Sequence, residues 1–142
     1  MLYLHPVAQI TATLLCLYAL WLGWARLKSL HLGRQTRFQR QRHALAGGMG
    51  LGLMTLGVFG GLIMARLYFG GWLLTGEHGV IGLVMLPFML FGLASGWALY
   101  QRPGPRKLLP LLHGLNNLLV LILAVLQIWE GSEVIEHFVT GV

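Results

Sequence analysis

Long hydrophobic runs alternate with short polar segments along the whole chain. Four such runs cover about residues 2–25, 44–69, 79–100 and 111–129. Because a helix needs about 20 apolar residues to cross a bilayer, each run has the length of one membrane span. An even number of spans returns the chain to the side on which it began. The pattern predicts an all-α fold, a transmembrane four-helix up-down bundle, with residues 1–142 forming a single integral membrane domain.

The composition places the chain in the same class. Of its 142 residues, 56% are hydrophobic and only 10% are charged, and the mean hydropathy is +0.72. Four spans leave no room for a separate soluble domain, which excludes a cytosolic enzyme with its own folded cofactor domain. We expect a multi-pass protein of a bacterial inner membrane, or of a comparable energy-transducing membrane, in contact with membrane lipid.

The charged residues fall into groups that indicate topology. Six basic residues lie in segment 26–42 and three in segment 102–107, whereas all four acidic residues lie at Glu77 and in segment 130–136. Cytoplasmic loops are enriched in Lys and Arg, so the two basic segments are expected inside and both termini on the non-cytoplasmic side. Topology also accounts for the pI of about 10.3, and no nucleic-acid partner is expected.

One histidine stands near the start of each predicted span, at His5, His43, His78 and His113. Successive helices run in opposite directions, so His5 and His78 are expected at the outer membrane level and His43 and His113 at the inner level. Each pair comes from non-consecutive helices, which lie diagonally across a simple up-down bundle. A flat ligand between two such histidines could be held from both faces.

The residues that share a helix face with each histidine are mostly small. These faces recur at steps of 4, 7, 11, 14 and 18 residues. The four faces are His5, Gln9, Ala12, Cys16, Ala19 and Gly23; His43, Gly47, Gly50, Met54, Gly57 and Gly61; His78, Gly82, Met85, Met89, Gly92 and Gly96; and His113, Asn117, Val120, Ala124 and Gln127. Small faces can simply let helices pack closely. Four converging on one axis predict instead a hollow interior filled by a non-protein group.

Haem is the group that suits such an interior, because imidazole is a standard axial ligand of haem iron. Zinc is a poorer candidate, since its tetrahedral sites need four ligands close together. Haem propionates need cationic or hydrogen-bonding partners. Arg66, the only basic residue expected on the outer side, is the candidate there, unless its side chain only reaches to the membrane interface. Gln9, Asn117 and Gln127 lie on the haem-facing stripes and are either hydrogen-bond donors to the cofactor or links between helices.

The same residues resemble the cytochrome b561 family of dihaem transmembrane cytochromes. The similar features span about residues 4 to 130: His5-Pro6, His43 after a basic loop, Glu77-His78-Gly79, and His113-Gly114 after Arg102-Pro103. The resemblance implies two non-covalent b-type haems, with the iron of one held by His5 and His78 and that of the other by His43 and His113. Larger members add two flanking helices, so this chain resembles a minimal four-helix version.

Two histidines on each iron leave no coordination position for oxygen or substrate, so the expected activity is transmembrane electron transfer with no catalytic side chain. Its partners would be redox donor and acceptor proteins or a quinone, with further subunits of a membrane complex possible. Two alternatives stay open. One is a haem-free structural or assembly subunit of a larger membrane complex, and the other is a quinone or ferric reductase that uses the same haems, so whether the chain is an enzyme is left open.

Overall fold

The computed structural model describes residues 3–104 and 106–140, and this part of the chain is helical with no strand. Four long helices follow one another: α1 (Leu4–His31), α2 (Arg40–Phe69), α3 (Glu77–Gln101) and α4 (Leu108–Ile135). The short π-helical turn η1 (Glu136–Thr140) extends α4. The predicted all-α fold is confirmed.

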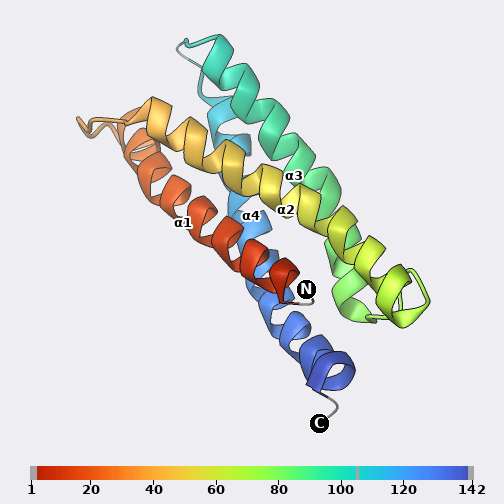
Figure 1. Ribbon diagram of the computed structural model, residues 1–142. Helices are drawn as coiled ribbons and strands as arrows, with labels where there is room; N and C mark the ends of the chain where they lie inside the picture. Colours follow the sequence, from red (N-terminus) through yellow and green to blue (C-terminus); the bar gives the residue numbers. More distant parts are fainter. Residues whose placement is uncertain (1–2, 105, 141–142) are drawn as a thin grey trace.

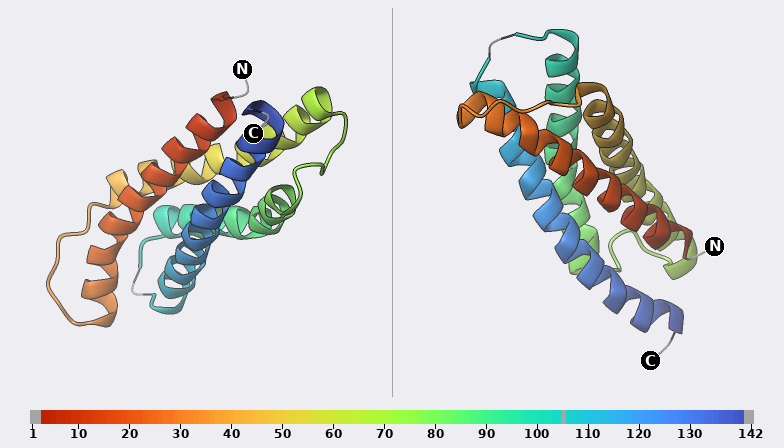
Figure 2. Two further views of the ribbon diagram at one scale, coloured as in Figure 1. Left: turned by 90° about the horizontal axis from the view of Figure 1, so that it is seen from below. Right: turned by 90° about the vertical axis from the view of Figure 1, so that its left-hand side faces the viewer.

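The four helices pack as an up-down bundle (Figure 1). Helix α1 packs against α2 and α4, and α3 packs against the same two helices, so α1 and α3 lie on one diagonal and α2 and α4 on the other. Both described ends of the chain lie with the α2–α3 connection, and the α1–α2 and α3–α4 connections lie at the opposite end (Figures 1 and 2). We call the end with the α1–α2 connection the basic end and the other the acidic end.

Each helix is longer than the hydrophobic run that predicted it. Helix α1 continues to His31 rather than ending near residue 25, and α4 continues to Ile135 rather than 129. The predicted start of the first span, Leu2, lies outside the described residues. Hydropathy marks only the apolar stretch, whereas backbone hydrogen bonding carries the helix into polar sequence. Lys28 and His31 in the last turn of α1 suit the negative end of the helix dipole.

The α2–α3 connection is short because a glycine stops α2 abruptly. Gly70 takes a left-handed conformation with φ of 85° at the end of α2, which residues with a side chain rarely adopt. Arg66 Nη1 donates a hydrogen bond of 3.3 Å to the Gly70 carbonyl, which places this cation at the acidic end. The chain then re-enters the bundle at Glu77.

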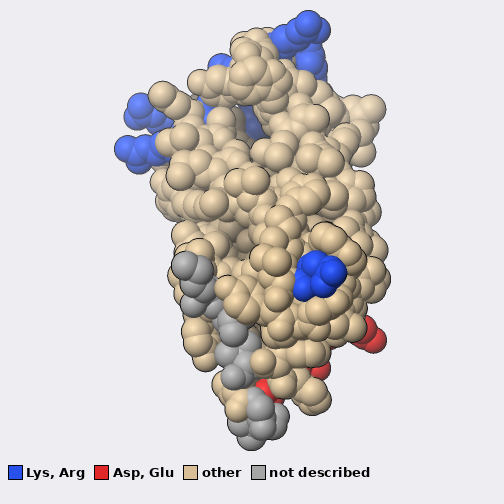
Figure 3. Space-filling view, turned by 45° about the vertical axis from the view of Figure 1, so that its right-hand side comes forward, with Lys and Arg blue, Asp and Glu red and all other residues tan. Residues whose placement is uncertain are grey.

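The outward surface of the bundle is apolar. All four helices are long and apolar enough to cross a bilayer, and large hydrophobic side chains such as Leu14, Leu56 and Ile122 are exposed. Figure 3 shows most Lys and Arg at one end, Asp and Glu at the other, and an almost uncharged surface between them apart from one basic group in the lower half. This is the architecture of a multi-pass integral membrane protein whose apolar surface contacts lipid.

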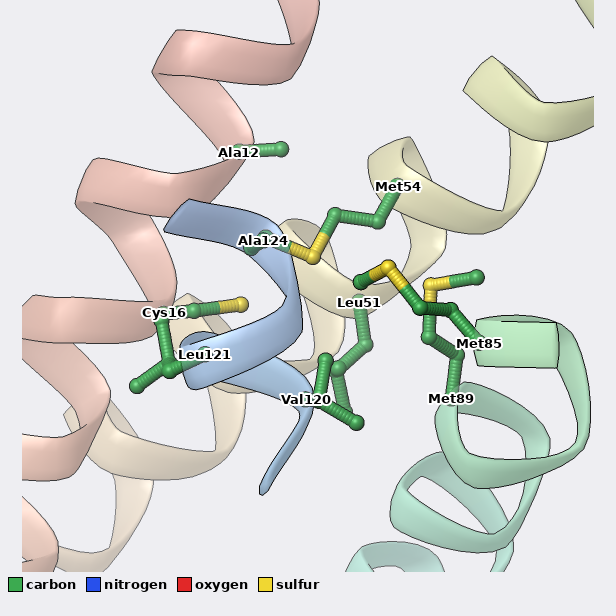
Figure 4. Packing of buried hydrophobic residues seen from close by; sticks show 9 residues of the cluster. All are labelled: Ala12, Cys16, Leu51, Met54, Met85, Met89, Val120, Leu121 and Ala124. Atoms are coloured by element: carbon green, nitrogen blue, oxygen red, sulfur yellow. The ribbon is translucent and has the colours of Figure 1, made fainter. Parts of the chain in front are cut away.

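The centre of the bundle is closed by packed side chains, so the expectation of a continuous hollow interior is wrong there. Met54, Met85 and Met89 fill it together with Val120, and a cluster of smaller residues surrounds them (Figure 4). Met89 is 1% exposed and Val120 is fully buried. Methionine is flexible enough to fill an irregular gap between glycine-rich faces. Space for a further group is therefore limited to the two ends.

Replacing Met89 with Ala should destabilise the protein by about 2–5 kcal/mol, because the side chain is buried at the midplane and its removal leaves a cavity there. Unfolding in detergent, followed by circular dichroism, measures the effect. Leu90→Ala is the matched control, since Leu90 is 49% exposed on the surface of the same helix and its loss should change stability little. Equal destabilisation by both variants would contradict a packed central plug.

Candidate cofactor sites at the two ends of the bundle

The structure brings the four span histidines together in two pairs. The ring centres of His5 and His78 are 6.2 Å apart with planes inclined by 80°. Those of His43 and His113 are also 6.2 Å apart, with planes inclined by 70°. Each pair joins diagonal helices, α1 with α3 and α2 with α4. His5 and His78 start their helices at the acidic end, and the other pair lies at the basic end.

Each of these rings lies against a glycine of a consecutive helix, with α1 paired with α2 and α3 with α4. A Cβ atom would approach the imidazole Cε1 within 3.0 Å at Gly61 beside His5, 3.1 Å at Gly23 beside His43, 3.1 Å at Gly96 beside His113, and 3.2 Å at Gly131 beside His78. Real Cβ contacts are seldom so short, so any side chain there would push the ring. Each end of the bundle thus receives two histidines and two glycines, one residue from each helix.

These four glycines occupy the same position relative to the histidine of their own helix. Each lies 18 residues after the histidine of its own helix, as Gly23 does after His5, which is about five complete turns. A histidine at one end and a glycine at the other end therefore occupy one face. Sequence reasoning placed Gly23, Gly61 and Gly96 on the faces but missed Gly131, and it did not show which glycine meets which ring. The constant spacing of 18 residues between histidine and glycine in the first three helices was the signal that could have identified Gly131.

Hydrogen bonds at the basic end set which ring nitrogens carry protons. His43 Nδ1 lies 2.8 Å from the Ala19 carbonyl, which can only accept, so Nδ1 is the donor. Ser95 Oγ donates to the Phe91 carbonyl at 2.6 Å and lies 2.8 Å from His113 Nδ1, so it accepts from that nitrogen. Both rings then keep Nε2 as the unprotonated nitrogen, the form that a metal needs.

Asn117 lies beside His113, as its place on the helix face predicted. Its Nδ2 donates to the His113 carbonyl at 2.9 Å and is 3.2 Å from each ring nitrogen. Asn117 Oδ1 is buried and has no hydrogen-bond partner among the described residues. The side chain fits into space left by Gly92, where a Cβ would overlap Oδ1.

The acidic end has a similar arrangement with fewer hydrogen bonds. Gln127 Nε2 donates to the His78 carbonyl at 3.0 Å, while His78 Nδ1 is buried with no partner in the part of the chain that the structure describes. Gln9 Nε2 donates to the Leu53 carbonyl on α2 at 3.3 Å rather than to either histidine. Gln9 therefore links two helices, and its predicted role toward a cofactor stays a prediction.

The remaining candidates lie away from the ring pairs. Arg66 is exposed on α2, five residues beyond Gly61, so its predicted role with a propionate stays a prediction. The two other histidines also lie outside the ring pairs, with His31 at the end of α1 and His137 in η1. Within residues 3–104 and 106–140 no group of three or more His, Cys, Asp or Glu could hold a metal ion. The histidines come in twos, which suits an ion whose other ligands are not from the protein.

No family model, curated protein or solved structure matches this chain. The resemblance to the cytochrome b561 family therefore rests on the residues quoted above. Function has to be argued from the two sites themselves.

Proposed function

We propose that this protein transfers electrons across a membrane through two b-type haems, one held by His5 and His78 and the other by His43 and His113. The separation of the ring centres carries this proposal. A bond of about 2 Å between metal and imidazole nitrogen on each side, with about 1 Å more from each nitrogen to its ring centre, adds to about 6 Å. Both pairs stand at 6.2 Å, so a single iron fits between the rings in each.

The surroundings of the rings also fit a flat macrocycle. All four histidines are only partly covered by protein, although their helices pack tightly at the midplane. The glycine beside each ring keeps the neighbouring backbone close without a side chain in the way. The Ala19 carbonyl beside His43 Nδ1 and Ser95 Oγ beside His113 Nδ1 are the kind of outer partner that metal-bound histidines commonly have.

Bound haem would supply a one-electron couple at each end of the bundle. His5 with His78 and His43 with His113 would hold the two groups, and donors and acceptors would reach them from the two ends of the bundle. The chain's own part is to hold the rings in place and to exclude water between the ends, where Met54, Met85, Met89 and Val120 are packed. A redox protein or a quinone at each surface would complete the path.

The direct test is the colour of the purified protein. After expression with sufficient haem, we expect a red protein whose reduced-minus-oxidised spectrum is b-type and whose haem content is about two per chain. A colourless protein from the same cells would contradict the proposal and favour a haem-free structural subunit, with the glycine faces serving only close helix packing.

Ser95→Ala should weaken the site at the basic end and leave the other unchanged. The substitution removes the acceptor of His113 Nδ1, and loss of such a partner typically lowers affinity about tenfold or more. Titration of haem into the apoprotein measures it. Thr55→Ala is the control, since the Thr55 hydroxyl donates only to the Leu51 carbonyl of its own helix. Equal loss in both variants would show a general effect on the fold.

The basic end is expected on the cytoplasmic side, because it carries the Lys and Arg clusters. A cysteine introduced by Gln35→Cys in the α1–α2 connection should react with an impermeant maleimide only after the cells are opened. Ser132→Cys at the acidic end should react in intact cells. Cys16 is buried and gives a low background. The reverse pattern of labelling would invert the orientation.

A further inference from the structure

Two adjoining grooves lie at the basic end, where the α1–α2 connection folds back over α1. One, of ≈ 510 Å³, is lined by residues 37–42. The other, of ≈ 200 Å³, is lined by Trp21, Trp24 and Lys28 of α1 and by connection residues that include Thr36 and Arg37. Arg37 and Gln39 line both grooves and so join them.

The fold builds the second groove with an apolar wall and a cationic rim. Thr36 Oγ1 donates to the Ala25 carbonyl at 2.6 Å, which fixes the connection against the end of α1. Trp21 and Trp24 are 67% and 50% exposed, and they face outward from the bundle. Lys28 Nζ lies 5.8 Å from the centre of the Trp24 ring, so a cation is held at the edge of the aromatic wall.

Within residues 3–104 and 106–140, no carboxylate lies at this end to pair with its cations. Segment 26–42 contains six basic residues and no acidic one, and all four Glu residues belong to the opposite end. Arg40 is engaged by α3, since its guanidinium donates to the Tyr100 carbonyl and lies 4.6 Å from the Tyr100 ring. Lys28 and Arg37 form the rim beside the tryptophans, and no carboxylate of the described residues lies there to neutralise them.

We propose that these grooves bind an anionic phospholipid, with its phosphate between Lys28 and Arg37 and an acyl chain along Trp21 and Trp24. Tryptophan typically marks the membrane interface, which is the level of lipid headgroups. Basic residues beside that level attract anionic lipid. The aromatic wall selects a lipid over a free anion or an acidic protein segment, because neither of those needs an apolar surface next to the charge. The proposal does not depend on haem.

The test uses the full-length protein in detergent, with lipid binding followed by native mass spectrometry. The double variant Lys28→Gln/Arg37→Gln is compared with Arg102→Gln/Lys107→Gln, which loses the same charge at the same end of the bundle but outside both grooves. Phosphatidylglycerol should bind the first variant about tenfold more weakly than the unaltered protein and the second within about twofold. Phosphatidylcholine should bind all three weakly. Helix content by circular dichroism and haem content by absorption are recorded for each sample.

Three results would overturn the proposal. Equal weakening in both double variants would show a general effect of net charge. Equal binding of phosphatidylcholine and phosphatidylglycerol would show that the rim does not recognise the anion. Displacement of phosphatidylglycerol by millimolar inorganic phosphate would show a small-anion site without use of the Trp21 and Trp24 wall. One further variant would support the proposal. Trp24→Ala leaves the net charge unchanged, and if it weakens phosphatidylglycerol binding, the ligand is a lipid and not a free phosphate.

Discussion

Protein with His78→Ala is expected to contain about one haem per chain instead of two. The variant removes one axial ligand from the acidic end, where His5 would be left facing an empty position 6.2 Å away. The pair at the basic end lies at the opposite end of the bundle, beyond the packed methionines, so its haem should remain with an unchanged spectrum. Haem per protein and the reduced-minus-oxidised spectrum are the measurements. His113→Ala should give the converse result.

His137→Ala provides the control for that experiment, because His137 is exposed in η1 and takes no part in either pair. It should keep both haems. Loss of both haems in His78→Ala would contradict two separate sites, and retention of both would show that His78 is not a ligand. Either result would refute the pairing proposed here even if the wild-type protein is red.

The sequence was sufficient for the number, order and direction of the helices. Hydrophobic runs of this length leave few alternatives in a bilayer, because every backbone group must be satisfied within a helix. The direction of each span then decides that His5 meets His78 and His43 meets His113. The end at which each pair lies follows from the same alternation.

Hydropathy could not locate the helix ends, and this had a direct consequence for the site. The fourth span was expected to stop at residue 129, so Gly131 fell outside it and its contact with His78 was missed. The midplane was misjudged for a different reason. Small residues on the faces suggested space, but Met54, Met85 and Met89 share those faces and are long enough to meet in the centre. The residues that share a helix face can be found from the sequence, but how far their side chains extend into the bundle cannot.

Polar side chains on one helix lie against glycines on the consecutive helix, a match that the residues of a single helix face do not show. Gln9 on α1 lies against Gly57 on α2, Asn117 on α4 against Gly92 on α3, and Gln127 on α4 against Gly82 on α3. Each amide side chain thus faces a glycine on its antiparallel partner, as each histidine does. The glycines serve two purposes: they admit the amide side chains, of which Gln9 and Gln127 link two helices by hydrogen bonds, and they leave room for the imidazoles.

Gly61→Val is expected to remove the haem at the acidic end and to spare the other. A Cβ at this position already comes within 3.0 Å of His5 Cε1, and the two methyl groups of Val reach further, so the ring has to leave its place opposite His78. We expect about one haem per chain, with the spectrum of the remaining haem matching that of His78→Ala. The smaller change, Gly61→Ala, should shift the spectrum or weaken the site without abolishing it.

Gly60→Val separates this local effect from the cost of a β-branched residue in the helix. Gly60 is the adjacent residue of α2, and a Cβ there meets nothing within 4 Å, so both haems should remain. The haem at the basic end reports in the same sample whether the bundle is still folded. Loss of haem from Gly60→Val to the same extent, or two unperturbed haems in Gly61→Val, would show that the contact between this glycine and His5 does not position the ring. A loss confined to Gly61→Val would instead show that the site requires a glycine beside His5.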